Sequence, residues 1–276
     1  MGHTLVQVES LQYDTIFKKA FRQVDLFTGL VEDFTGIHLE IDEVEKEKVF
    51  EPPIGQVKIR FDLFAEDKKN RVIVEAQHAT SQDDFDRFFY YHAIAMAETI
   101  HNSKDYRFPK VIMTLVFFTE KKTPKPDNNI LVQDLEIRTL KGEIVPNARG
   151  LKHQILFIFT GDPISDLEVP EPCLEWIKAI HDTMDEQADE NKYENPLIKQ
   201  LFQIISKDQT SPDEYAQMKE EYNQQQALKN AFEEGQGKGE RKAKLEAARQ
   251  LKALGKLTEA EIANAIGLTL KEVQAL

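Results

Sequence analysis

Residues 56–79 read QVKIRFDLFAEDKKNRVIVEAQHA, and this segment is the most informative part of the chain. Two largely apolar runs, 56–65 and 71–79, flank a segment made of acidic, basic and amide residues. Short apolar runs around such a segment are typical of two antiparallel strands joined by a tight turn. We therefore predict a β-hairpin here.

The alternation of side chains along the two strands brings polar groups together. In a strand, successive side chains point to opposite faces of the sheet. Glu75 and Gln77 therefore share one face of the second strand. Strict alternation on the first strand places Ile59, Phe61 and Leu63 on one face and Arg60, Asp62 and Phe64 on the other.

The register of the hairpin predicts a cation site. If the turn centres between Lys68 and Lys69, Asp62 lies directly opposite Glu75. Opposed residues have Cβ atoms roughly 4.5–5.5 Å apart. Two carboxylates at this separation repel unless a cation lies between them, and their oxygens suit Mg²⁺ or Mn²⁺. A slip of one residue would turn one carboxylate to the other face and destroy the site.

Helical and strand-like patterns alternate around the hairpin. Apolar residues recur at helical spacing from 13 to 34, with Asp14 as a candidate N-cap and Gly36 just past the end. The run 110–118 is almost continuously apolar, as in a strand buried on both faces. These patterns predict an α/β fold, a mixed sheet flanked by helices. Further predicted elements are a helix over 82–101, a loop over 120–129 and strands over 131–140 and 154–160.

Beyond Asp162 the strand signals stop and helical stretches follow. The glycine-rich run 235–239 interrupts them, and we place the main domain boundary there. The first domain then covers 1–234, and the second covers 235–276. The sheet core extends over about 10–162, and the all-α extension 163–234 holds predicted helices at 172–187, 196–206 and 212–234.

The tail has the spacing of a helix-turn-helix. A basic helix over 238–254 precedes two short helices, which Gly267 separates. Ala263 and Val273 fall where such a motif needs a small residue and a core aliphatic. The last helix carries few side chains that read base edges, so DNA binding and a packing or dimerisation role both stay open. Two capping boxes are predicted, Thr258 with Glu261 and Thr269 with Glu272.

Charge is unevenly distributed along the 276 residues. The formal net charge of −13 argues against nucleic-acid binding, because phosphate contacts need Lys and Arg. Eleven acidic residues and only two lysines lie between 162 and 194, whereas seven basic and two acidic residues lie between 238 and 256. An acidic total therefore coexists with a local basic segment.

Composition favours a globular chain in a reducing compartment. Hydrophobic residues make up 41% and charged residues 30% of the chain, as in folded domains. With Cys173 as the one cysteine, neither an internal disulfide nor a cysteine-based zinc site can form. The longest apolar run, 111–118, is too short to span a bilayer, and the first residues lack a signal-peptide pattern. We therefore expect a cytoplasmic protein with no membrane segment.

The hairpin resembles the motif of the PD-(D/E)XK nuclease superfamily. Phe-Asp-Leu at 61–63 is followed by a short polar turn and then by Val-Ile-Val-Glu-Ala-Gln at 72–77. Within that superfamily the chain is most similar to the Rpn family of recombination-promoting nucleases and transposases. The further matches are Asp14, Phe17 and Lys18 in a helix of pattern Asp-x-x-Phe-Lys, Arg87 with Tyr90 or Tyr91 in the helix after the hairpin, and a Gly-Lys-Gly-Glu tract with a helical tail from Gly237 onward.

This resemblance implies a restriction-endonuclease-like fold and a DNA endonuclease of low sequence preference, linked to recombination. Asp62 and Glu75 would then be catalytic and hold Mg²⁺, with Mn²⁺ as an alternative, and the metal would activate a water. Gln77 is the third catalytic position and departs from the lysine that the superfamily often has there. Its amide can orient a water or contact a phosphate, but it carries neither a charge nor a proton.

The resemblance also implies a set of supporting residues. Asp14 or Glu32 would complete the metal site from the first helix, and Arg87 would bind the scissile phosphate. Lys18 and Tyr91 would support or bind the substrate. DNA is then the expected partner, and cutting two strands would make a homodimer convenient.

Each supporting residue also has a purely structural interpretation. Asp14 can cap a helix, Lys18 can lie on the surface, and Arg87 can pair with Asp84 or Glu75. Tyr90 and Tyr91 are expected to divide between core and site. His78 is expected in the core or on the surface, and no role is assigned to His92 or His101.

Two other functions stay open at the level of sequence. The chain can be a DNA- or protein-binding module that keeps the nuclease fold without turnover, which Gln77 and the acidic balance favour. It can also be an RNA nuclease of the same fold. Intact Asp62 and Glu75 oppose the inactive module, because a scaffold does not need paired carboxylates.

Overall fold

The computed structural model describes residues 5–50, 59–78, 84–100, 108–121, 127–145, 151–162, 164, 169–254 and 258–276. The predictions for 56–58, Ala79, 82–83 and His101 lie outside these residues. The chain divides into two compact units, Met1–Lys219 and Glu220–Leu276. None of the helices in the described part of the chain combines the length and the apolar character needed to cross a membrane.

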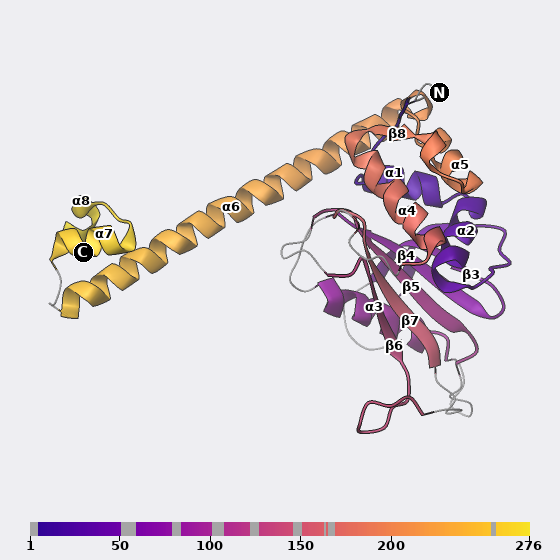
Figure 1. Cartoon of the computed structure of the whole chain (residues 1–276), viewed down its shortest axis with the longest axis horizontal. Helices are drawn as coiled ribbons and strands as arrows, with labels where there is room; N and C mark the ends of the chain where they lie inside the picture. The colour runs from indigo at the N-terminus through magenta and orange to yellow at the C-terminus, as the bar shows by residue number, and fades with distance from the viewer. Residues whose placement is uncertain are drawn as a thin grey trace. The chain divides into compact units, whose positions relative to one another are not determined.

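A six-stranded mixed sheet forms the centre of the first unit (Figure 1). Its strand order is β2-β3-β4-β5-β7-β6. The β4, β5 and β7 strands run parallel, and the other three pair antiparallel with their neighbours. The strands are β2 (Glu45–Phe50), β3 (Ile59–Glu66), β4 (Asn70–Gln77), β5 (Val111–Phe118), β6 (Ile130–Leu135) and β7 (Leu151–Phe159).

The predicted hairpin and its register are confirmed by β3 and β4. Leu63 pairs with Val74 and Glu66 with Arg71, which is the register that a turn centred between Lys68 and Lys69 imposes. Asp67 holds the turn, since its Oδ1 accepts the backbone N–H of Lys69 at 2.7 Å and of Asn70 at 2.6 Å. Such Asx contacts favour a tight reversal of the chain.

The strand predicted at 110–118 is confirmed as β5, which lies between β4 and β7 and is buried on both faces. Its alternate side chains enter two different clusters. Leu115 and Phe117 pack on one face of the sheet, whereas Val116 and Phe118 pack on the other. A continuous apolar run is what a strand covered on both sides requires.

Helices cover the two faces of the sheet. On one face, α1 (Asp14–Phe21), α2 (Val24–Thr35), α4 (Glu171–Asp182) and α5 (Pro196–Ile204) share a single apolar cluster with the strands. On the other face, α3 (Asp84–Ala97) packs through Phe88, Ala95 and Met96. The prediction of a mixed sheet flanked by helices is therefore confirmed.

The single helix predicted over 13–34 is wrong, because the chain forms α1 and α2 with a break at Arg22–Gln23. Gln23 has extended backbone angles (φ −69°, ψ 124°). At about 100° per residue, the buried Leu26 and Leu30 would face roughly a quarter turn away from the buried Ile16 and Ala20 on one straight helix. The break lets both apolar stripes face the sheet. Gly36, with φ 68°, ends α2 as predicted.

Three strands of the structure, β1, β2 and β8, were not predicted from the sequence. β1 (Leu5–Gln7) pairs with β8 (Gln187–Asp189), so strands do occur beyond Asp162. Each has three residues, too few for a periodic pattern. β2 carries the charged sequence EKEKVF and lies at the edge of the sheet, where charged side chains reach water and discourage further pairing.

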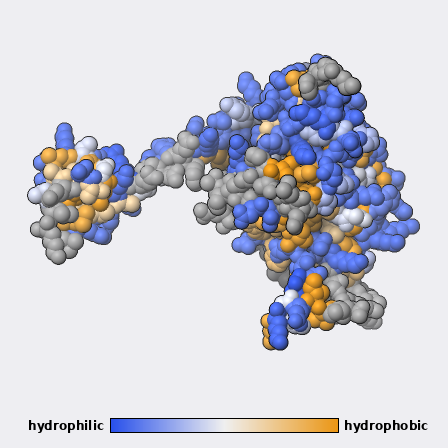
Figure 2. Space-filling model, viewed as in Figure 1, coloured by the Kyte–Doolittle hydropathy of each residue, from blue (hydrophilic) through white to orange (hydrophobic). Residues whose placement is uncertain are grey.

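The second edge strand, β6, ends at Leu135, before the predicted 140, and an isolated bridge between Arg138 and Ile144 follows. Exposed apolar side chains lie along it and the hairpin beyond it, including Val132, Ile137 and Leu140. They contrast with the mostly hydrophilic surface seen in Figure 2.

The helix α6 (Pro212–Leu254) runs through the glycine-rich segment, so the predicted break at 235–239 is wrong. Glycine lowers helix stability by about 1 kcal/mol per residue without forbidding the conformation. An ion pair between Glu234 Oε1 and Lys238 Nζ, 2.6 Å long, spans the segment at i,i+4 spacing. The residue-235 domain boundary stays a prediction.

In the second unit, α7 (Glu259–Ile266) and α8 (Leu270–Gln274) follow α6. Gly267, with φ 69°, separates them as predicted. The predicted capping box of Thr269 and Glu272 is confirmed, whereas the Glu261 side chain of the other box lies outside the described residues. The buried side chains of this unit are Ala248, Ile262, Ala263 and Val273.

Candidate active site

All seven predicted site residues line one cleft of about 730 Å³. Residues from α1, β3, β4 and α3 meet there, although they are far apart in sequence. The predicted residues are Asp14, Lys18, Asp62, Glu75, Gln77, Arg87 and Tyr91, and they share the cleft with Val49, Ile59, Arg60, Ala76 and His78.

The cleft opens where the sheet forks. Pairing between β3 and β4 ends at Leu63 and Val74. Before that point, β3 continues to pair with β2 through Phe61, and beyond it β4 continues to pair with β5 through Glu75. The ends of the two strands therefore separate, and α1 on one face of the sheet and α3 on the other both reach the gap.

The predicted alternation along β3 is wrong at Asp62. Ile59 and Phe61 join the cluster on the α3 face, whereas Leu63 joins the cluster on the α1 face. Glu47, across the β2–β3 pair, has a left-handed backbone (φ 55°), and Glu47 and Asp62 interrupt the pairing. Asp62 thus lies at an irregularity in the strand, a local distortion often found next to functional sites.

The carboxylates of Asp62 and Glu75 each accept a backbone N–H from the opposite strand at the fork. The backbone N–H of Asp62 donates to Glu75 Oε1 at 3.2 Å, and the N–H of Ala76 donates to Asp62 Oδ2 at 3.1 Å. Each carboxylate thus accepts an N–H that the separated strands leave unpaired. Burial, and then the negative charge of Asp62, raise the pKa of the Glu75 carboxyl well above its ordinary value.

Lys18 supplies a positive charge to these acids. Its Nζ lies 3.0 Å from Asp62 Oδ1, 2.8 Å from Asp14 Oδ2 and 3.6 Å from Glu47 Oε1. Burial disfavours the ammonium, but the Asp62 and Asp14 carboxylates outweigh it and raise the pKa of Lys18 above its ordinary value. The side chain is 12% exposed, so the surface interpretation of Lys18 is wrong.

Asp14 and Glu32, the two acids predicted to complete the metal site from the first helix, lie in different places. Asp14 is the first residue of α1 and makes no cap, because the N-cap residue is Tyr13. Its carboxylate instead holds Lys18. Glu32 does not line the cleft, and its Oε2 lies 3.1 Å from Nδ1 of His38. Of these two acids, Asp14 lines the cleft and Glu32 does not.

On the opposite wall, Arg87 of α3 donates from Nη2 to Gln77 Oε1. The guanidinium also lies over the Phe88 ring, 4.5 Å from its centroid. The amide of Gln77 thus orients the arginine toward the cleft. A positive charge is therefore present at this end of β4, although residue 77 itself is neutral.

Tyr91, rather than Tyr90, lines the cleft. Its ring makes edge contacts with Phe61 and Phe88, with centroids 5.9 and 6.2 Å away. Burial raises the pKa of the Tyr91 hydroxyl, which stays protonated and able to donate at neutral pH. Tyr90 packs against the apolar cluster of the α3 face.

Two polar residues that line the cleft were not predicted, Arg60 and His78. Arg60 is 68% exposed and its Nη1 lies 3.9 Å from Glu47 Oε2. His78 is half-buried, with Nδ1 2.8 Å from Thr119 Oγ1 and no partner among the described residues for Nε2. Burial lowers its pKa to about 4, so the ring is neutral. Arg60 could have been found from its position two residues before Asp62, but nothing in sequence marks His78.

The donor set suits a hydrated divalent cation. Among the described residues, no group of three or more His, Cys, Asp or Glu side chains is arranged to hold a metal ion. Asp62 and Glu75 still offer two carboxylates in an open cleft, and Mg²⁺ is usually bound through one or two carboxylates together with several waters. Burial and the neighbouring Asp62 carboxylate raise the pKa of Glu75, and a bound cation would favour its ionised form. The two residues therefore fit such an ion.

Comparison of the chain with protein-family models, with curated proteins and with solved structures found no match. The interpretation of the cleft therefore rests on its own geometry and on the motif resemblance.

Proposed function

We propose that the chain is a Mg²⁺-dependent DNA endonuclease of the Rpn type, hydrolysing phosphodiester bonds with low sequence preference. The observation that supports this most is the convergence of seven residues, chosen from sequence, in one cleft. A chance set of surface residues from α1, β3, β4 and α3 has no reason to meet at one fork of the sheet.

Asp62 and Glu75 are the residues that would hold the metal ion. When bound, Mg²⁺ supplies a water of lowered pKa and stabilises charge on the phosphate. Glu75 would be ionised in that state, because a nearby cation favours the carboxylate over its protonated form. The backbone contacts at the fork keep the two side chains side by side in the absence of a ligand.

Lys18 and Arg87 would bind the phosphate from the two walls of the cleft. Arginine and lysine are the side chains that neutralise phosphate groups. Lys18 lies 3.0 Å from Asp62, so its ammonium is already close to the proposed metal site. Its charge takes the place of the lysine that the superfamily often carries at position 77. Gln77 then serves as a positioning residue for Arg87.

The experiment is cleavage of supercoiled plasmid by the full chain, in Mg²⁺, in Mn²⁺ and in EDTA. We expect nicking that requires the metal and falls by more than about 100-fold in Asp62→Ala and Glu75→Ala, since even residues behind the ligands contribute 10–100-fold. Asp25→Ala is the matched control, because Asp25 is an exposed acid of α2 outside the cleft. Folded protein without cleavage in either metal would reject the proposal.

One observation favours a second function, a nuclease-like binding module without turnover. The Lys18 ammonium already neutralises Asp62, as a permanent internal cation would. Thermal unfolding in increasing Mg²⁺ separates the two functions. An endonuclease should gain stability with Mg²⁺, and Asp62→Ala should abolish the gain. A binding module should show no Mg²⁺ dependence in either protein.

A further inference from the structure

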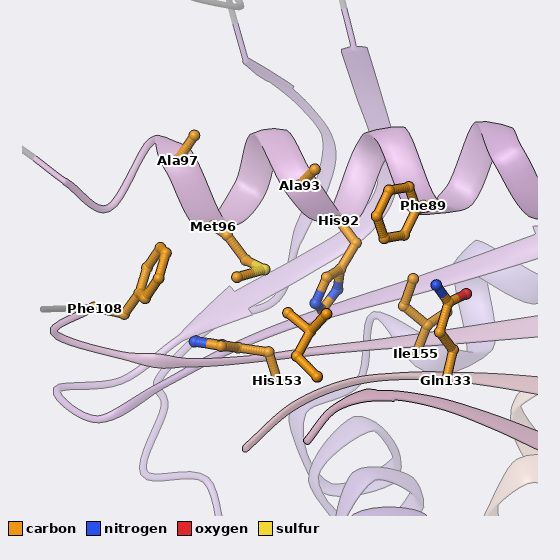
Figure 3. A pocket seen from close by; sticks show the side chains of 10 residues that line it. Phe89, His92, Ala93, Met96, Ala97, Phe108, Gln133, His153 and Ile155 are labelled. Atoms are coloured by element: carbon orange, nitrogen blue, oxygen red, sulfur yellow. The ribbon is translucent and has the colours of Figure 1, made fainter. Parts of the chain in front are cut away.

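A second cavity, of about 220 Å³, lies beside α3 and does not involve the cleft (Figure 3). In Figure 3, His92 and Met96 project from α3 toward His153 and Ile155 of the sheet. Phe89 and Leu135 belong to its lining and are 45% and 36% exposed, so the cavity reaches the surface there. The remaining lining residues are Ala93, Ala97, Phe108 and Gln133.

The proton on His153 is fixed by the backbone. The N–H of Ile112 donates to His153 Nδ1 at 2.9 Å, so Nδ1 carries a lone pair and, in the neutral ring, Nε2 carries the hydrogen. Among the described residues, the hydrogen bond from Ile112 is the one that the His153 ring makes, which leaves the Nε2–H available. The cavity lining therefore offers a hydrogen-bond donor to a ligand.

This proton position argues against a metal ion in the cavity. A histidine ligand needs a bare nitrogen, and the only nitrogen of His153 without a partner already carries hydrogen. His92 is close, with ring centroids 6.4 Å apart, and its Nδ1 lies 2.9 Å from Thr114 Oγ1. Its second nitrogen can donate or accept, depending on the direction of the threonine hydroxyl.

The surroundings also disfavour a charged ligand. Burial lowers the pKa of His92 to about 4 and lowers that of His153, so both rings are neutral at pH 7. No Lys, Arg, Asp or Glu is found among the described residues that line the cavity. A charged ligand would lose its hydration without gaining an ionic partner.

Size and shape limit the ligand to one ring. An apolar cavity of about 150 Å³ in another protein accepts benzene, so about 220 Å³ accommodates one aromatic ring with a short substituent. Phe89 and Phe108 offer aromatic surfaces, and Phe108 lies edge-on to the His153 ring with centroids 5.0 Å apart. Apolar walls with one or two convergent polar groups are typical of small-molecule sites.

We propose that this cavity binds an uncharged, single-ring aromatic molecule that bears a carbonyl or equivalent acceptor, which receives the Nε2–H of His153. The ring lies among Phe89, Met96, Phe108 and Ile155, and the acceptor faces the two histidines. The site is independent of the proposed nuclease function, because none of its residues lines the cleft.

The test compares two probes of nearly equal size, acetophenone and ethylbenzene, by ligand-observed NMR titration of the full chain. Acetophenone has the acceptor and ethylbenzene lacks it. We expect acetophenone to bind about fivefold more tightly, since a neutral hydrogen bond contributes roughly 1 kcal/mol. The side-chain Nε2–H signal of His153 should shift with acetophenone alone.

Ala93→Leu fills the cavity from α3 without touching either histidine contact, and it should weaken acetophenone binding by at least about tenfold. Ala231→Leu, on the exposed surface of α6, is the matched control and should bind as the wild type does. Equal affinity for the two probes, no binding of acetophenone, or binding that survives Ala93→Leu would each overturn the proposal. Nuclease activity does not enter any of these measurements.

Discussion

The two sides of α3 place ionisable groups in different environments, one polar and one apolar. Arg87 and Tyr91, one turn apart, face the cleft, where Lys18 pairs with Asp14 and Asp62. Phe89, His92 and Met96 face the cavity, where titratable rings are kept neutral. At about 100° per residue, these two sets lie on nearly opposite sides of the helix. One helix therefore separates a polar chemical environment from an apolar one.

Lys18 and His92 show why one buried group keeps its charge and another stays neutral. Lys18 stays charged because three carboxylates lie within 3.6 Å of its Nζ. His92 stays neutral because its surroundings offer a hydroxyl and no acid. Burial disfavours charge in both places, and the partners, rather than the depth, decide which form persists. Variants on the two flanks should therefore respond differently to pH, metal and ligand.

The largest expected effect is a loss of folding stability at acidic pH, caused by His92 beside the cavity. Because the pKa of His92 is about 4 in the folded chain and 6.5 ordinarily, its stabilising contribution is complete above pH 6.5 and is lost as the pH falls toward 4. The loss is on the order of 3 kcal/mol. His92→Asn, which keeps a polar partner for Thr114, should remove this part of the pH dependence. Urea unfolding at pH 7 and 4.5 measures it, and parallel pH profiles for both proteins would contradict the assignment.

The second-largest effect on stability is expected for Lys18→Met in the cleft. Removing the ammonium leaves Asp14 and Asp62 without their cation and should destabilise the chain by on the order of 2 kcal/mol, below the 3–5 kcal/mol of a fully buried pair. Added Mg²⁺ should restore part of this stability, because the metal takes over the missing charge. Lys19→Met is the control, since Lys19 pairs with Glu214 away from the cleft. Equal behaviour of the two variants in thermal unfolding would reject the role of Lys18.

A third prediction uses paired variants of α3. Arg87→Ala should lower plasmid cleavage about tenfold, the effect of one charged contact to phosphate, and should leave acetophenone binding unchanged. Phe89→Ala should leave plasmid cleavage unchanged and should weaken acetophenone binding about fivefold through lost ring contact. Cleavage rates and probe titrations on both proteins check the separation. A variant that alters both readouts would show that α3 couples the two sites.

The smallest expected effect concerns Glu75 without divalent ions. Its pKa is raised in the folded chain, so its contribution to stability is present below the ordinary value of 4.5 and is lost as the pH rises toward the raised value. Glu75→Gln keeps the acceptor for the Asp62 N–H and should raise the melting temperature at pH 8 by about 2 °C or more. Scans in EDTA at pH 5 and 8 test this. A gain in melting temperature for Glu75→Gln that is no larger at pH 8 than at pH 5 would contradict this prediction.

Local pattern was sufficient for several elements. The hairpin register followed from turn chemistry around Lys68 and Lys69, and β5 followed from its continuous apolar run. Both depend on neighbours in sequence, so both are readable from sequence. The same register predicted that Asp62 and Glu75 lie close together, and side-chain contacts to the backbone hold them together where the strands separate.

Other features depend on packing between distant segments. The break between α1 and α2 follows from the need of two apolar stripes to meet the same sheet. The irregularity at Asp62 depends on Glu47 of β2, which carries no recognisable strand pattern. The helical state of the glycine-rich part of α6 was also unpredictable, because glycine permits turn and helix alike.

Local sequence patterns predicted the hairpin, its paired carboxylates and the apolar central strand, because turn chemistry and hydrophobic patterning act over a few residues. Packing between distant segments brings α1 and α3 to one cleft from opposite faces, and it places the Ile112 N–H against Nδ1 of His153. Those outcomes depend on which distant groups become neighbours, and local periodicity carries no information about such contacts.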